Sequence, residues 1–187
     1  MNDILDKYKT DIDTRMHEIL LSKDGIADPL REAMEYSLYA GGKRVRPVLL
    51  MEAAGAVGGD PKSMLDYAAA IEFIHTYSLI HDDLPALDND EYRRGKKTNH
   101  KVFGDDMAIL AGDGLQALAY EVMLSCIEES AKRSEETSKK IRAANEIAKA
   151  AGTEAMVSGQ VMDINSCKDE VSLTRLEKMH RMKTGAL

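Results

Sequence analysis

Five carboxylates lie within ten residues near the middle of the chain, at Asp82, Asp83, Asp88, Asp90 and Glu91. So dense an acidic cluster repels itself unless cations lie among the side chains. Carboxylate oxygens with no cysteine nearby suit a hard ion that keeps water and phosphate ligands, which indicates magnesium. A solvated acidic helix end would have the same composition, so both interpretations stay open at this point.

Basic residues follow the acidic cluster directly, at Arg93, Arg94, Lys96 and Lys97. Arginine grips phosphate oxygens in a fork of two hydrogen bonds, and a metal held by the acids would neutralise the same phosphates. Acids and bases in this order therefore predict a site for a diphosphate ester. An EF-hand loop is excluded, because the loop counted from Asp88 lacks the glycine required at its sixth position.

The spacing of the acidic residues can be tested on a helix. His75 and Asp82 are seven residues apart, so at about 100° per residue they share one face. Asp82 and Asp88 would lie about 120° apart on an unbroken helix. Pro85 interrupts the hydrogen bonding, so we expect residues 84–87 to bulge and to bring Asp88 back beside Asp82.

A second basic cluster precedes these residues, in the run Gly41-Gly42-Lys43-Arg44-Val45-Arg46-Pro47. The two glycines are expected to end one helix, and Pro47 is suited to the first turn of the next. Lys43, Arg44 and Arg46 would then lie on a tight turn beside free backbone N–H groups, which favours anion binding. Such a turn is also ordinary protein surface, and the nearby segment 82–94 favours a second phosphate pocket.

Composition limits the class of protein. A chain of 187 residues can bury one sizeable core, so we expect a single domain over residues 1–187. The net charge of −7 argues against a nucleic-acid surface. Cys126 and Cys167 form no CxxC pair, which suits a reducing compartment. We find no basic leader and no run of 18 apolar residues, so we expect no membrane insertion and a cytoplasmic location.

Helical periodicity runs through the whole chain, and the fold class is predicted to be all-α. Asp28-Pro29 and Asp60-Pro61 each look like an N-cap followed by proline at the first helical position. Apolar and polar residues nowhere alternate with period two over a long stretch, so no sheet is expected. The predicted helices cover about 3–22, 29–39, 61–81, 105–129, 134–151, 153–165 and 172–186, with another beginning near Pro47.

Three motifs in this order resemble those of the trans-prenyl (polyprenyl) diphosphate synthases, above all their bacterial farnesyl and short-chain geranylgeranyl branch. The motifs are Gly42–Pro47, the run from Ser78 through Gly95, and Lys183-Thr184-Gly185. The resemblance implies an isoprenoid-synthase-type helical bundle around a central cavity, and usually a homodimer. It implies magnesium-assisted ionisation of dimethylallyl or geranyl diphosphate and head-to-tail condensation with isopentenyl diphosphate to give farnesyl diphosphate. The alternatives are geranylgeranyl diphosphate as the product, a terpene cyclase that ionises one substrate, or a non-catalytic subunit.

The same resemblance implies roles for individual residues. Asp82 and Asp88 would hold magnesium against the allylic diphosphate, assisted by Arg93, Lys183 and Thr184. The isopentenyl diphosphate would be held by Lys43, Arg46, His75 and Arg94. The catalytic set implied is Asp82, Asp83, Asp88, Arg93 and Lys183, and the residues implied to limit product length are Tyr77 and Ser78.

The chain departs from the family pattern at its end. The family carries a second Asp-rich motif and further helices downstream of the Lys-Thr-Gly element, and this sequence stops at Leu187. We therefore expect an N-terminal part of a longer enzyme, inactive as 187 residues alone. A natural short homologue that binds without catalysing is the alternative.

Several other polar and small residues have two interpretations. Asp105-Asp106 precede a helix and suit its N-terminus. Gly112 and Gly114 favour close helix packing. Gln160 and Asp163 lie three apart on one helix face, either as partners of site residues or as satisfied core polar groups.

Overall fold

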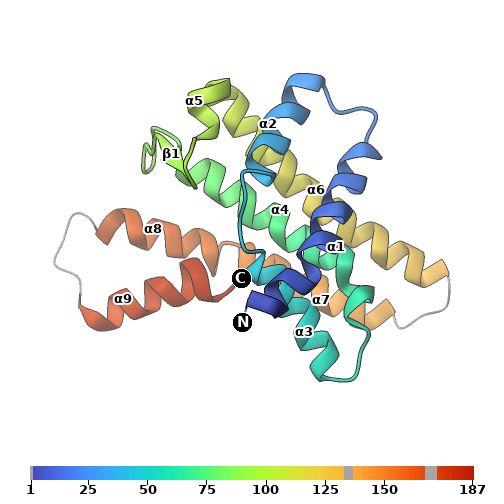
Figure 1. Cartoon of the computed structure of the whole chain (residues 1–187). Coiled ribbons are helices and arrows are strands. Elements are labelled where there is room, and N and C mark those ends of the chain that lie inside the picture. The colour runs from blue at the N-terminus through green and yellow to red at the C-terminus, as the bar shows by residue number, and fades with distance from the viewer. Residues whose placement is uncertain (1, 133–136, 167–171) are drawn as a thin grey trace. The chain divides into compact units, whose positions relative to one another are not determined.

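The chain is seen here as a computed structural model that describes residues 2–132, 137–166 and 172–187, and it is almost entirely helical (Figure 1). The only strands in those ranges are β1 (Tyr92–Arg93) and β2 (Lys96–Lys97), so the predicted all-α class is confirmed. The long helices are α1 (Asn2–Leu21), α2 (Asp28–Leu38), α3 (Val45–Ala56), α4 (Leu65–Asp82), α6 (Asp105–Lys132), α7 (Thr137–Ala151), α8 (Met156–Ser166) and α9 (Leu173–His180). The short helical pieces are η1 (Pro61–Met64), α5 (Asn99–Phe103) and η2 (Arg181–Gly185).

The helix boundaries agree with the prediction except in a few places. Asp60 caps η1 by accepting a hydrogen bond from the Lys62 amide at 3.0 Å. The expected cap at Asp28 is wrong: Ala27 occupies that position, and the Asp28 carboxylate lies in the first turn, where it suits the helix dipole. The predicted 172–186 helix divides into α9 and the π-helical η2. Residues 134–136 of the predicted 134–151 helix, and Cys167, lie outside the described ranges.

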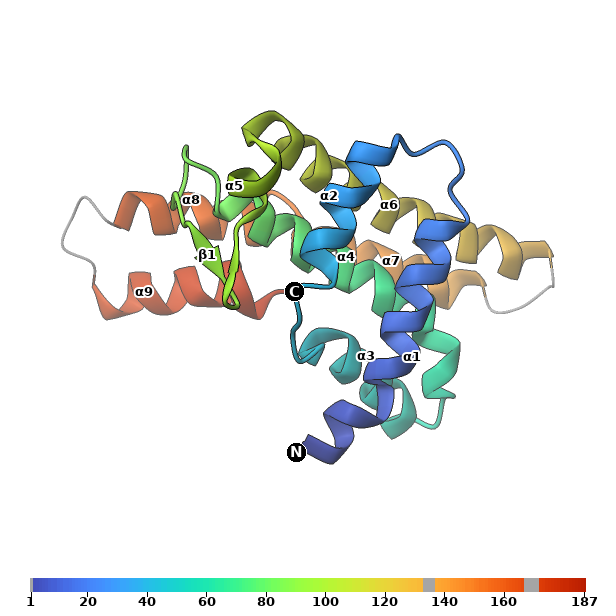
Figure 2. The same cartoon turned by 45° about the horizontal axis from the view of Figure 1, so that its top comes forward.

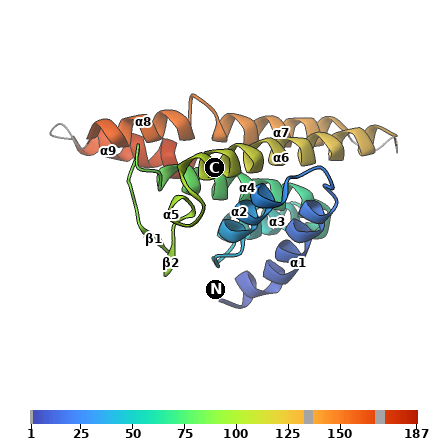
Figure 3. The same cartoon turned by 90° about the horizontal axis from the view of Figure 1, so that it is seen from above.

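The chain divides into two compact units, Met1–Met123 and Leu124–Leu187, and the single-domain organisation stays a prediction. In the first unit α4 is the central helix, and α1, α2 and α3 pack against it (Figures 2 and 3). Every residue of α4 from Tyr67 to Ile74 is buried, and all of them except Glu72 are apolar or aromatic, as expected for a core helix. His75 and Asp82 therefore lie on the central, buried helix of this unit.

The N-terminal part of α6 closes against α4 and α2 through glycines, as expected for Gly112 and Gly114. A Cβ atom at Gly112 would overlap the His81 ring, and one at Gly114 would lie 3.3 Å from the Met34 sulfur. Among the described helices α6 alone is long and apolar enough to cross a membrane by length and composition. Its residues Ala108, Ala111 and Leu115 are fully buried in the first unit, as expected for a core helix.

Candidate active site

The acidic segment begins where α4 ends. The helix stops at Asp82, and the backbone amide of Asp88 then donates to the Asp82 carbonyl at 3.0 Å. The chain therefore returns to the helix end through a turn over residues 84–88. The predicted return of Asp88 to Asp82 is confirmed for the backbone, and Pro85 lies in the turn that follows the end of α4.

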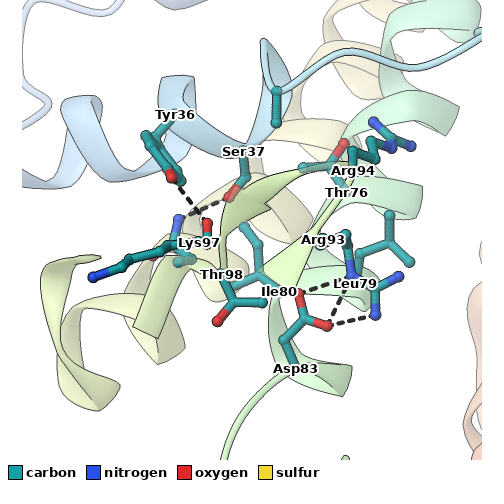
Figure 4. A pocket seen from close by; sticks show the side chains of 12 residues that line it. Tyr36, Ser37, Thr76, Leu79, Ile80, Asp83, Arg93, Arg94, Lys97 and Thr98 are labelled. Atoms are coloured by element: carbon teal, nitrogen blue, oxygen red, sulfur yellow. Dashed lines mark hydrogen bonds and ion pairs between the residues drawn. The ribbon is translucent and has the colours of Figure 1, made fainter. Parts of the chain in front are cut away.

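Asp83 is engaged by an arginine. Its side chain is 4% exposed, and Arg93 Nε donates to both carboxylate oxygens at 2.8 Å while Nη2 donates to Oδ1 (Figure 4). Burial raises the pKa of Asp83, and the hydrogen bond from Arg93 acts in the opposite direction. The hydrogen bond to Asp83 raises the pKa of Arg93. The pair fixes the direction of the Arg93 guanidinium, whereas Asp82 is half-buried and Asp88 exposed.

The carboxylates of the acidic segment could hold magnesium only together with other ligands. Within the described ranges no three His, Cys, Asp or Glu side chains converge on a point that could hold a metal ion. Magnesium, however, is commonly bound by one or two carboxylates together with waters and substrate phosphates. Asp82 and Asp88 fit an ion that binds together with a diphosphate, and they do not fit a metal cage made of protein alone.

The two arginines lie on a β-hairpin that the sequence did not predict. β1 and β2 pair with Arg93 opposite Lys96, and the two turn residues Arg94 and Gly95 have φ values of 53° and 78°. A two-residue hairpin loop needs positive φ at both positions, and Asn-Gly or Asp-Gly is its usual signal. Arg-Gly does not give that signal.

The two arginines of the hairpin contact different partners. Arg93 faces Asp83, whereas Arg94 points away from it (Figure 4) and donates to the Gly41 carbonyl. A Cβ atom at Gly42, where φ is 136°, would come within 2.7 Å of Arg94 Nη1. Gly42 therefore lets the guanidinium lie directly against the turn, and the hairpin connects the acidic segment to the basic cluster.

A cavity of about 540 Å³ opens beside this turn, within the range of roughly 300–1,000 Å³ usual for small-molecule sites. The four residues expected to hold isopentenyl diphosphate all line it, from three different segments: Lys43, Arg46, His75 and Arg94. Arg46 Nε is buried and has no hydrogen-bond partner in the described part of the chain. An unpaired buried donor is costly, and a bound anion would satisfy it.

Arg44 does not belong with the other cations of the turn. It is 3% exposed and pairs with Glu72 at 2.8 Å and with Asp13 at 2.7 Å. Arg44 lines the same cavity, but its charge is not available to an anion in the way that the sequence suggests for all three cations of the turn. The reason is that Asp13 and Glu72, on α1 and α4, already neutralise its charge.

His75 is neutral in this environment. Burial, with the positive charges of Arg46 and Arg94, lowers the pKa of His75 from 6.5 to about 3. A neutral imidazole keeps one N–H donor and one acceptor, so His75 is suited to donate to an anion without carrying charge.

We expect the His75 ring to stay neutral from pH 8 down to about pH 5, because protonation would place a positive charge in a poorly solvated position beside Arg46 and Arg94. Carbon-edited NMR of the ring Hε1 measures this, with the urea-unfolded chain as the control that titrates near pH 6.5. As the pH falls from 6.5 toward 3, His75 takes up a proton in the unfolded chain but not in the folded chain. This difference should lower the free energy of unfolding over that pH range. A folded-state midpoint near pH 6.5 would contradict this.

A smaller cavity of about 30 Å³ lies behind the hairpin and has room for about one or two waters, not for a substrate (Figure 4). Around it, Tyr36 Oη donates to the Lys97 carbonyl at 2.9 Å, and Asn99 Nδ2 donates to the Ala33 carbonyl at 2.8 Å. These contacts hold the hairpin on α2. Sequence reasoning missed both residues, since neither stands in a motif.

The second unit contains the Lys183-Thr184 element. Lys183 Nζ contacts Asp163 Oδ2 at 2.5 Å, so Asp163 is a partner of a predicted site residue. Gln160 and Lys183 are half-buried and Thr184 is exposed.

A Cβ atom at Gly159 on α8 would overlap the Lys183 backbone and lie 2.8 Å from the Met182 carbonyl carbon. Gly159 thus allows η2 to lie directly on α8, where Asp163 reaches Lys183.

We expect Gly159→Ala to destabilise this unit by about 1–3 kcal/mol, the usual cost of overpacking. The gain in helix propensity is about 1 kcal/mol and is smaller, because backbone atoms must move. Thermal unfolding followed by circular dichroism measures the change. Asn165→Ala, at an exposed position of α8, is the control and should stabilise slightly; an equal rise in both variants would show that η2 does not need the glycine.

Known proteins resemble this chain in sequence and in structure. A model of the polyprenyl synthetase family matches residues 27–187. Farnesyl diphosphate synthase from Geobacillus stearothermophilus is 48% identical over 183 residues, which make up 98% of this chain and 60% of that enzyme. The large subunit 1 of the heterodimeric chloroplastic geranylgeranyl pyrophosphate synthase of Arabidopsis thaliana is 52% identical over 167 residues, or 87% of this chain and 44% of that subunit.

Solved structures agree with the sequence comparisons. A geranyltransferase from Legionella pneumophila superimposes with a TM-score of 0.91 at 39% identity, covering all of this chain and 65% of that one. A farnesyl/geranylfarnesyl diphosphate (FPP/GFPP) synthase from Zymomonas mobilis gives a TM-score of 0.84 at 34% identity, with 100% and 67% covered. The chain spans about 60% of the length of its Geobacillus relative.

Proposed function

Because this chain belongs to the polyprenyl synthetase family, as its three motifs predict, we propose that it carries the substrate sites of a short-chain trans-prenyl diphosphate synthase. In this proposal isopentenyl diphosphate binds in the cavity lined by Lys43, Arg46, His75 and Arg94. An allylic diphosphate binds at the end of α4, beside Asp82, Asp88 and Arg93.

The observation that carries the proposal is the cavity. Residues that are 19 to 51 positions apart, on the turn, on α4 and on the hairpin, converge on one space and include a buried arginine nitrogen without a partner in the described part of the chain. Seven residues separate His75 from Asp82 on one helix face, which is about 10 Å along the axis. Two diphosphates held at these points would lie side by side along α4.

The chemistry follows from the charges. Breaking the allylic C–O bond leaves a diphosphate anion and an allylic cation, so the anion must be stabilised as it forms. Magnesium, when bound by Asp82 and Asp88, supplies part of that stabilisation as a Lewis acid. Arg93, fixed by Asp83, supplies donors to the same leaving group. The basic side chains of the cavity hold isopentenyl diphosphate so that its double bond attacks the allylic cation. The new C–C bond leaves a positive charge on the isopentenyl part, which is lost when a proton passes to the released diphosphate.

We also propose a product, an assembly state and a location for the protein. Farnesyl diphosphate is the favoured product and geranylgeranyl diphosphate the alternative, since relatives of both names match. The proposed assembly is a homodimer and the proposed location is cytoplasmic, although plant relatives are named as chloroplastic.

Incubation of the protein with magnesium and an allylic diphosphate, with and without isopentenyl diphosphate, tests the function. The 187-residue chain should be inactive by itself. A chimera that continues after Leu187 with the part of the Geobacillus enzyme that follows the matched segment should make longer prenyl diphosphates only when both substrates are present. A cyclised hydrocarbon formed without isopentenyl diphosphate would favour a terpene cyclase, and no product from the chimera would favour a non-catalytic subunit.

A further inference from the structure

We propose that Arg44 is a positioning residue of the cavity: it anchors the Gly41–Arg46 turn to α1, α2 and α4 and thereby directs Lys43 and Arg46 at the ligand, without touching the ligand itself. The inference rests on the proposed function, in which the cavity takes isopentenyl diphosphate. It assigns a separate role to the one cation of the turn that is turned inward.

All three guanidinium nitrogens of Arg44 are occupied. Nε donates to Asp13 Oδ1 at 2.7 Å, Nη1 donates to Glu72 Oε1 at 2.8 Å, and Nη2 donates to the Leu38 carbonyl at 2.7 Å. The side chains of Arg44 and Glu72 are each 2% exposed. The planar fork thus joins three helices at once, a geometry that lysine cannot reproduce.

The turn needs such an anchor because its backbone has little preference of its own. Gly41 and Gly42 have φ values of 100° and 136°, and Arg44, at the start of α3, has φ 50° and ψ 37°. The left-handed region is unfavourable for a residue with a Cβ atom. The three hydrogen bonds of Arg44 hold this conformation, and Lys43 and Arg46 on either side of it take their directions from it.

The anchor also controls the charge of the cavity. Glu72 lines the cavity, three residues before His75 on α4, and would repel a diphosphate if it were uncompensated. Burial lowers the pKa of Arg44, but Glu72 and Asp13 outweigh burial and raise it, so Arg44 keeps its charge. With Glu72 neutralised by Arg44, the net positive charge of Lys43, Arg46 and Arg94 is available to the ligand.

Calorimetric titration of isopentenyl diphosphate into the 187-residue chain tests the inference. Arg44→Lys keeps the charge and removes the fork, so Kd should rise by about 10–100-fold, the range seen when partners that orient a binding group are removed. The matched control is Arg15→Lys, because Arg15 also joins α1 to α4, through Asp66 at 2.6 Å, but lies outside the cavity. Its Kd should equal that of the unaltered chain. Lys43→Ala, which removes a proposed direct contact, gives the reference loss.

The outcomes separate the two proposals. If Arg44→Lys remains helical by circular dichroism and binds as tightly as the unaltered chain, while Lys43→Ala binds weakly, Arg44 is merely structural and only this inference fails. If the unaltered chain shows no saturable binding, the assignment of the cavity fails and the inference fails with it. Should Arg44→Lys not fold, Asp13→Ala removes one of the three contacts and should weaken binding to a smaller degree; an unchanged Kd there would overturn the inference.

Discussion

Asp82→Ala should lower the rate of prenyl transfer by the chimera on the order of 10³-fold when magnesium is limiting. Loss of one carboxylate removes metal-assisted charge stabilisation worth several kcal/mol, and about 1.4 kcal/mol corresponds to a factor of ten. The fold should be nearly unaffected, because the substitution also removes one member of a self-repelling acidic cluster. The melting temperature should therefore be unchanged or slightly raised.

Glu91→Ala is the matched control for Asp82→Ala. Glu91 belongs to the same acidic segment, but its side chain is 69% exposed and its ion pair with Lys101, at 3.5 Å, is of the kind that contributes little. Transfer should continue at nearly the unaltered rate in this variant. Full activity of Asp82→Ala at limiting magnesium would remove Asp82 from the metal site.

Tyr77→Ala should shift the products of the chimera to longer chains, with the first condensation little affected. Tyr77 is 7% exposed and stands five residues before Asp82, about 7.5 Å along α4. Burying the five carbons of another isoprene unit is favourable by about 4 kcal/mol, so elongation does not stop for lack of driving force. A steric barrier must stop it, and Tyr77 is a bulky residue at that level.

The surroundings of Tyr77 keep its ring in place. The ring packs edge-on against His81 with the centroids 5.8 Å apart, and Gln116 Nε2 donates to the hydroxyl at 3.4 Å. Burial raises the pKa of Tyr77 to about 12, so the hydroxyl stays protonated. Product chromatography measures the chain length, and Tyr77→Phe, which keeps the ring, is the control with unaltered products. An unchanged distribution in Tyr77→Ala would place the barrier elsewhere, for which the neighbouring Ser78 is the next candidate.

Much of the helical framework could be predicted from local sequence. Asp60-Pro61 marks the start of η1, and the apolar periodicity of residues 61–81 matches η1 and α4. These signals act over one or two turns, so they are visible without the fold. The hairpin at 92–97 was missed because Arg-Gly carries no turn signal, although both residues adopt positive φ.

The site residues were predicted less completely, because their roles depend on distant contacts. In the run Lys43-Arg44-Val45-Arg46 the three cations look equivalent. Arg44 differs from the other two because it pairs with Asp13 and Glu72, which lie 31 and 28 residues away in the sequence. The contact of Gly159 with η2 likewise depends on the π-helical turn at Arg181–Gly185, for which the sequence gives no rule.

A crystal structure of the chain with isopentenyl diphosphate bound would show whether the cavity is the substrate site. We expect the diphosphate in the 540 Å³ cavity, with its oxygens on Lys43, Arg46, His75 and Arg94 and with Arg44 still paired to Glu72. A diphosphate bound elsewhere while this cavity stays empty would contradict it.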